Sequence, residues 1–154
     1  MAESHILDIT RLIQLTVAPV FMLTAVGTII NALMNRLGRA VDRRRQLEEL
    51  IPAYEGDDRR KMLEEHAVME QRIRLTLWST ALAVTSALFV CLLIGFAFVG
   101  AFVTLDLATT VAGLFIAAVI ALTFSLLLFL REVFLAAFTA RHTPELQAIL
   151  TERK

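Results

Sequence analysis

The chain has little of what most catalytic, metal-binding and disulfide-bonded proteins use. Of its 154 residues one is cysteine, Cys91, so no intramolecular disulfide forms, and we expect this thiol to pack within an apolar helix. The three histidines lie far apart in the sequence, and His66 with Glu70 supplies only two ligands where zinc takes three or four. No glycine-rich phosphate loop occurs, and no serine stands in a context typical of a nucleophile. We therefore expect no enzymatic activity, no metal and no cofactor.

Charge is absent from three long stretches, residues 12–35, 75–105 and 107–130. These stretches contain 24, 31 and 24 residues, and about 20 apolar residues cross the hydrocarbon core of a bilayer as a helix. The chain is also 57% hydrophobic, with a mean hydropathy of +0.68, which is more than a soluble domain of this size needs. We predict an all-α membrane protein with three transmembrane helices, over about 12–35, 75–102 and 107–130.

Basic residues are nearly absent from two of the segments that flank these spans. Only Arg11 precedes the first span, and the segment between the second and third spans has Asp106 but no lysine or arginine. Ten basic residues lie instead between the first and second spans: Arg36, Arg39, Arg43, Arg44, Arg45, Arg59, Arg60, Lys61, Arg72 and Arg74. The positive-inside rule places this segment and the C-terminus in the cytoplasm, and the N-terminus outside. The arginines are expected to attract anionic lipid headgroups, whereas nearby acidic residues balance the charge and argue against nucleic acid as a partner.

Residues 36–74 are predicted to form a helical hairpin on the cytoplasmic side. No proline interrupts the chain between the first span and Pro52, so the first helix is expected to continue to Ile51. Pro52, a glycine and two aspartates mark a turn, after which a second helix begins near Arg59 and runs into the second span. The two helices would then be antiparallel. A short amphipathic helix is predicted over 144–152, to lie on the membrane or on the hairpin.

The first span carries a polar stripe. Thr24, Thr28, Asn31 and Asn35 follow one another at spacings of four, three and four, which places all four on one face of a helix. A polar face in a membrane has to meet protein or water, because unsatisfied amide groups in hydrocarbon are costly. Two interpretations follow: the stripe lines a water-filled pathway for ions in a homo-oligomer, or its side chains hydrogen-bond across packed helices.

Three arginines continue this region into the cytoplasm. Arg36, Arg39 and Arg43 would form a basic rim at the inner mouth of such a pathway, where they would attract anions or repel cations. Three helices with one polar face cannot enclose a channel alone, so a pore requires several copies around a symmetry axis.

Four charged residues lie at the inner ends of the three spans. Arg36, Arg74, Arg131 and Glu132 all come within a few residues of an uncharged stretch, and therefore at about the same depth. Glu132 is the expected partner of Arg36 or Arg74. We predict that this structural ion-pair cluster ties the third helix to the hairpin.

Three segments of the chain resemble a known family. The segments are "APVFMLTAVGTIINALMNRLGRAVDRRRQLEE", "EQRIRL" and "LLLFLREVFLAAF", and the resemblance extends from about Ile13 to Phe138. Together they are similar to the bacterial membrane family known as domain of unknown function 2721. The resemblance implies a small protein of the bacterial inner membrane and carries no activity with it.

The expected function is therefore an ion channel or ion-conducting pore, formed by several copies and lined by the first transmembrane helix. The alternative is a non-conducting scaffold or accessory subunit whose cytoplasmic hairpin docks a partner. Ion flux through liposomes would separate the two.

Overall fold

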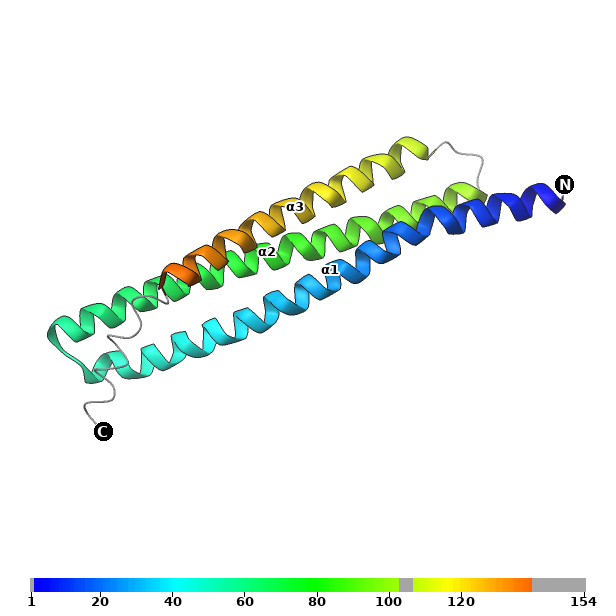
Figure 1. Ribbon diagram of the computed structural model, residues 1–154. Helices are drawn as coiled ribbons and strands as arrows, with labels where there is room; N and C mark the ends of the chain where they lie inside the picture. The colour runs from blue at the N-terminus through cyan, green and yellow to red at the C-terminus, as the bar shows by residue number, and fades with distance from the viewer. Residues whose placement is uncertain (1, 103–106, 140–154) are drawn as a thin grey trace. The chain divides into compact units, whose positions relative to one another are not determined.

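The computed structural model describes the backbone of residues 2–102 and 107–139, and the side chains of residues 17–100 and 107–137. This part of the chain forms three long α-helices, α1 (Ala2–Leu50), α2 (Gly56–Phe102) and α3 (Ala108–Thr139) (Figure 1). A single turn of 3-10 helix, Ile51–Ala53, follows α1. The all-α prediction is confirmed for the described residues, and the helix predicted over 144–152 lies outside them.

All three helices are long and apolar enough to cross a membrane. The candidate spans are Val17–Ala53, Gly56–Gly100 and Ala108–Ala137. Their outward surfaces carry large apolar side chains, among them Phe21 on α1 and Phe124 on α3. Exposed apolar side chains of this size are suited to lipid rather than to water. The prediction of three membrane-spanning helices is confirmed at the level of helix length and composition.

The connection between α1 and α2 is shorter than the sequence predicted. α2 begins at Gly56, three residues before the predicted start near Arg59. Gly56 has a φ of 66°, a left-handed conformation that glycine adopts without steric cost. Asp57 then lies in the first turn of α2, where its carboxylate is 2.8 Å from Nη2 of Arg60 and 3.3 Å from Nζ of Lys61. An acidic residue is favourable at this end of a helix, and these ion pairs start the helix earlier.

Buried positions repeat every seven residues along each helix. On α1 the fully or nearly fully buried side chains are Val26, Leu33, Ala40 and Leu47; on α2 they include Met62, Met69, Thr76, Ala83 and Val90; on α3 they include Ala118, Ser125 and Glu132. A seven-residue repeat is the pattern of coiled-coil packing, in which one seam of each helix faces its neighbours.

The helices divide into two compact units. The first comprises residues 1–31 and 81–125, and the second comprises residues 32–80 and 126–154. In the first unit most of the buried side chains of α2 and α3 are small, including Ser86 and Ala118, whereas Val90 and Leu93 of α2 are larger. The hydroxyl of Ser86 donates a hydrogen bond of 2.8 Å to the main-chain carbonyl of Ala118. Small residues allow close approach of helices in a membrane, and a serine can add a hydrogen bond there.

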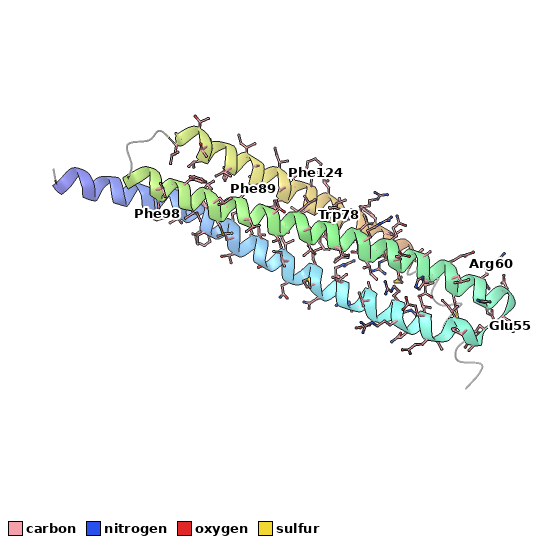
Figure 2. All side chains as sticks on the ribbon, turned by 180° about the vertical axis from the view of Figure 1, so that it is seen from behind. Glu55, Arg60, Trp78, Phe89, Phe98 and Phe124 are labelled. Atoms are coloured by element: carbon pink, nitrogen blue, oxygen red, sulfur yellow. The ribbon has the colours of Figure 1, made fainter. Side chains whose placement is uncertain are left out.

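The second unit contains the hairpin between α1 and α2. Leu47, Met62 and Met69 form its buried apolar cluster, and partly buried side chains from both helices and the turn pack against it: Leu50, Ile51, Tyr54 and Val68. Trp78, at the other end of this unit's part of α2, is 63% exposed (Figure 2). An exposed tryptophan at the end of a span is typical of a membrane–water interface.

Candidate functional site

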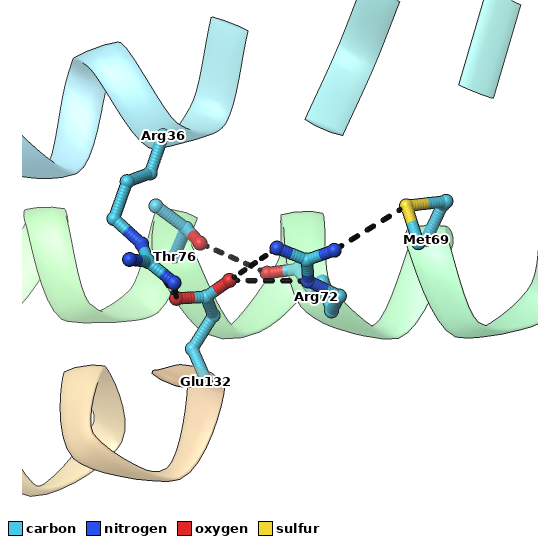
Figure 3. Close-up of polar contacts among 5 residues, drawn as sticks. All are labelled: Arg36, Met69, Arg72, Thr76 and Glu132. Atoms are coloured by element: carbon cyan, nitrogen blue, oxygen red, sulfur yellow. Dashed lines mark hydrogen bonds and ion pairs between the residues drawn. The ribbon is translucent and has the colours of Figure 1, made fainter. Parts of the chain in front are cut away.

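A buried carboxylate joins the three helices of the second unit. Glu132 of α3 lies between Arg36 of α1 and Arg72 of α2 (Figure 3). Nε and Nη2 of Arg36 lie 2.9 and 2.7 Å from Oε2 of Glu132. Nε and Nη2 of Arg72 lie 3.1 and 3.0 Å from Oε1. Each carboxylate oxygen is therefore occupied by a different guanidinium group.

The cluster compensates the cost of removing a charge from water. The side chain of Glu132 is 2% exposed, whereas those of Arg36 and Arg72 are 26% and 19% exposed. Burying an unpaired carboxylate would cost several kcal/mol, and two charge-assisted contacts to each oxygen offset this cost. Two arginines and one glutamate leave the cluster with a net charge of +1.

The two arginines are held by further contacts of their own. The guanidinium carbon of Arg36 lies 5.4 Å from the centre of the Phe129 ring, within the range of a cation–π interaction. Nη1 of Arg72 lies 3.7 Å from the sulfur of Met69. The hydroxyl of Thr76 donates a 3.0 Å hydrogen bond to the main-chain carbonyl of Arg72 (Figure 3). The ring of Phe129 and the sulfur of Met69 thus flank the two guanidinium groups beside Glu132.

The seven-residue repeat explains why Arg36 and Arg43 of α1 face inward. Arg36 and Arg43 follow the buried Leu33 and Ala40 by three positions, where α1 elsewhere carries half-buried apolar residues such as Ile29. Positions three apart on a helix are neighbours on one surface. The two arginines therefore replace apolar side chains at the edge of the packed seam.

Two residues predicted for the cluster lie elsewhere. Arg74 and Arg131 are exposed and form no ion pair with any residue that the structure describes. Arg74 is two positions, or about 200°, beyond Arg72 on the helix, so its side chain leaves from another face. Arg131 is adjacent to Glu132 and is turned outward for the same reason. Of the four predicted residues, the structure brings together Arg36 and Glu132, and Arg72 takes the place of Arg74.

The predicted basic rim is mostly neutralised within the chain. Arg43 pairs with Glu65 of α2 through two contacts, Nε to Oε1 at 2.8 Å and Nη2 to Oε2 at 3.2 Å. Arg36 is engaged by Glu132. Arg39 alone of the three is exposed on α1 and has no ion pair within the described residues. A basic rim around a pathway would need all three arginines on the outward face of α1. Arg36 and Arg43 lie instead on its inward face, and only Arg39 lies on the outward one.

The predicted polar stripe faces away from the packed seams. Thr24, Thr28, Asn31 and Asn35 are all exposed on α1. The hydroxyls of Thr24 and Thr28 donate to the carbonyls four residues earlier, at 3.3 and 3.1 Å. The donors of both hydroxyls are therefore satisfied within α1, and Thr85 of α2 and Thr123 of α3 bond in the same way. Asn31 and Asn35 make no such bond with any described residue. The side-chain hydrogen-bond donors of the stripe without a partner among the described residues are therefore those of these two amides.

Comparison with known families settles where the chain belongs. The family described as "Protein of unknown function (DUF2721)" matches residues 16–142. This range includes most of each of the three apolar helices and the Glu132 cluster. The chain is a member of this family. No curated protein and no solved structure matches it.

Two residues that form ion pairs between the helices of this DUF2721 chain, Arg72 and Glu65, were not predicted from the sequence to do so. Both lie three positions after buried methionines of α2, Met69 and Met62, and the seven-residue spacing of those methionines was the signal that could have found them. Methionines seven apart mark the packed seam of a helix, and a charged residue three positions further on lies at its edge.

His66, weighed with Glu70 as a metal pair, is engaged differently in the DUF2721 chain. Its Nε2 lies 3.1 Å from Oε1 of Glu48 on α1, and Arg44 lies 3.2 Å from the same oxygen. Glu70 is exposed. No group of three or more His, Cys, Asp or Glu side chains is close enough to hold a metal within the described residues.

Proposed function

We propose that the chain forms a homo-oligomeric ion-conducting pore of the bacterial inner membrane, with the outward face of α1 around the axis. Asn31 and Asn35 would line the pathway, accompanied by Thr24 and Thr28. Amide oxygens and nitrogens can replace part of the hydration shell of an ion. The ions pass between copies, and the helix seams inside each copy stay closed.

One observation carries this proposal. Asn31 and Asn35 are the only asparagines of the chain; both are exposed, lie in a stretch without charge, and lack a hydrogen-bond partner among the described residues. An amide side chain left unsatisfied in hydrocarbon costs several kcal/mol. A ring of copies gives both amides a polar environment.

We place the hairpin and the C-terminus in the cytoplasm and the N-terminus outside. Ten basic residues between the first two spans support this orientation. The exposed Arg74 and Arg131, with Trp78 four residues after Arg74, are suited to contact anionic lipid headgroups at the inner surface. Both arginines are free for this contact because Glu132 is taken by Arg36 and Arg72.

A non-conducting scaffold is the second candidate. The hairpin has its own apolar cluster around Leu47, Met62 and Met69 and does not depend on a spanning segment for its core. Leu63 is 48% exposed on this hairpin, beyond the uncharged stretches, and offers a partner protein an apolar contact. In that case the asparagines would serve only to join copies.

Purified protein in liposomes, assayed for ion flux, tests the pore. Asn31→Leu and Asn35→Leu replace each amide with an apolar side chain of similar size, and we expect each to lower the flux by about tenfold or more, since a dewetted apolar ring stops ions. Met34→Leu is the matched control, because Met34 is an exposed neighbour of Asn35 outside the polar stripe.

Three results would separate the candidates. Flux in the native chain and in Met34→Leu, but not in the two asparagine variants, supports the pore. Flux that survives both asparagine substitutions would place the pathway elsewhere. Absence of flux across a range of voltage, pH and calcium concentration, from protein that is oligomeric, would favour the scaffold.

A further inference from the structure

The outward face of α1 carries an unused pair of opposite charges just beyond the uncharged stretch. Arg39 and Asp42 are both exposed in the second unit, and neither forms an ion pair with any described residue. Their neighbours on the inward face behave differently, since Arg36 and Arg43 are each paired with a glutamate of another helix. The inward arginines of this segment thus form ion pairs within the chain, whereas Arg39 and Asp42 on the outward face have no such partner among the described residues.

Helix geometry explains why Arg39 and Asp42 do not satisfy each other. A pair three or four residues apart on a helix is more favourable when the acidic residue comes first. Here the arginine precedes the aspartate, the less favourable order. Arg44 and Glu48 pair in this order too, but Glu48 is also held by His66 of α2. No residue of another helix assists Arg39 or Asp42 in this way within the described part of the chain.

We propose that Arg39 of one copy pairs with Asp42 of a neighbouring copy, so that this stretch of α1 is the contact between subunits. Copies inserted by the same rule are parallel in a membrane, so equal residues lie at equal depth. Arg39 and Asp42 are three residues apart, or about 4.5 Å along the axis, a distance that an arginine side chain spans. Around a ring each copy then gives its arginine to one neighbour and its aspartate to the other.

Two further residues on the same face support a close contact there. Asn35 lies four positions before Arg39, and an asparagine that meets its counterpart across two parallel helices fixes their register. Gly38 weakens a helix interior, yet among the residues that the structure describes no atom beyond its own helix comes within 4 Å of the point where a Cβ would lie. Packing among the described residues does not explain this glycine, and the open space beside it allows the close approach of a second copy.

The inference rests on one part of the proposed function, that α1 faces another copy, and not on conduction. Its test uses the single cysteine of the chain. Cys91→Ser gives a cysteine-free protein, into which Gln46→Cys places a thiol on the same exposed face, seven positions after Arg39. Oxidation of native membranes is expected to cross-link copies through this thiol. Ala67→Cys, at an exposed position of α2 in the hairpin, is the matched control and is expected to give no cross-linked product.

Charge reversal then identifies the pair. In the Gln46→Cys protein, Arg39→Asp or Asp42→Arg alone makes the contact repulsive, and we expect about five- to tenfold less cross-linked product. The double variant with both reversals restores the attraction and is expected to recover the original yield. Single reversals without effect, or a double variant that stays low while the protein remains in the membrane, would overturn the inference.

Ion flux measured on the same variants keeps this inference apart from the pore. Charge-dependent cross-linking in a protein without flux would leave the subunit contact standing and remove the pore. Flux in a protein whose cross-linking does not change when Arg39 or Asp42 is reversed would support the pore and overturn the subunit contact.

Discussion

Nη2 of Arg36 lies 2.7 Å from Oε2 of Glu132, although 96 positions separate the two residues in the chain. The same carboxylate accepts from Arg72, so α1, α2 and α3 meet at one buried charge. An apolar seam with a seven-residue repeat presents a similar pattern again after seven residues, so it specifies the axial position of a helix less sharply than a directional polar contact does. A shared carboxylate is not interchangeable, and it fixes the axial position of α3 within the second unit.

Removing the charge of Glu132 on α3 should destabilise the protein more than any other conservative change in the second unit. Glu132→Gln leaves two guanidinium groups partly buried without their anion, and we expect a loss of about 3 kcal/mol in the free energy of unfolding, the lower end for a broken buried pair because both arginines remain partly hydrated. Unfolding in detergent, followed by circular dichroism, measures this loss. Glu70→Gln changes an exposed glutamate of α2 and should stay within about 0.5 kcal/mol of the native protein.

Arg72 and Arg74 provide a comparison of two arginines on one helix. Arg72→Ala removes both contacts to Oε1 of Glu132 and is expected to cost about 1.5–3 kcal/mol, the value of hydrogen bonds to a charged group. Arg74→Ala removes an exposed side chain and should cost less than about 0.5 kcal/mol. The same unfolding assay compares them, and equal costs would contradict the placement of Arg72 in the seam.

Arg43 and Glu65 should behave as a coupled pair. Each single alanine substitution removes a two-point contact between α1 and α2, and a double-mutant cycle is expected to give a coupling energy of about 1 kcal/mol, at the upper end for partly exposed pairs because Glu65 is nearly buried. Arg60 and Glu64 form the matched control, since both side chains are about 70% exposed and Nε of Arg60 lies 4.0 Å from Oε1 of Glu64. Their coupling should be close to zero.

Much of the fold follows from the sequence because two of its determinants are local. Lack of charge over 24 or more residues is enough to specify a spanning helix, and Pro52 with Gly56 is enough to specify a turn. The approximate depth of Glu132 followed from its place beside an uncharged stretch. Its second partner did not, because Arg72 and Arg74 both lie within three positions of the uncharged stretch, and what separates them is which face of α2 packs.

The polar stripe shows a second limit. Sequence alone treated Thr24, Thr28, Asn31 and Asn35 as equivalent polar groups, yet the threonine hydroxyls are satisfied by their own helix. A threonine can reach the carbonyl four residues back, whereas neither asparagine does so here. In the oligomer that we propose, the number of copies around these amides depends on contacts between molecules, which the pattern of one chain does not contain.

The seam between α2 and α3 in the first unit should tolerate small residues only. Ser86→Ala keeps the close approach and loses one hydrogen bond to Ala118, for which we expect about 0.6 kcal/mol. Ser86→Leu places three extra carbons where the side chain is 0% exposed, and overpacking of this kind costs about 1–3 kcal/mol or more. Thr85→Leu adds bulk at the neighbouring, less buried position and should cost less. A larger loss for Ser86→Ala than for Ser86→Leu would show that the hydrogen bond, not the close packing, holds the seam.

Membrane orientation can be tested from the hairpin turn. Glu55 is exposed between the 3-10 helix and α2, so Glu55→Cys in the Cys91→Ser protein presents a single accessible thiol. With the ten basic residues of the first connection in the cytoplasm, a maleimide that cannot cross membranes should label this thiol only after cells are broken. Thr110→Cys, exposed in the first turn of α3 on the opposite side of the span, should be labelled in intact cells from which any outer barrier has been removed. The reverse pattern would put Arg36, Arg72 and Glu132 at the outer surface, where the basic cluster would break the positive-inside rule, and the orientation we propose would have to be inverted.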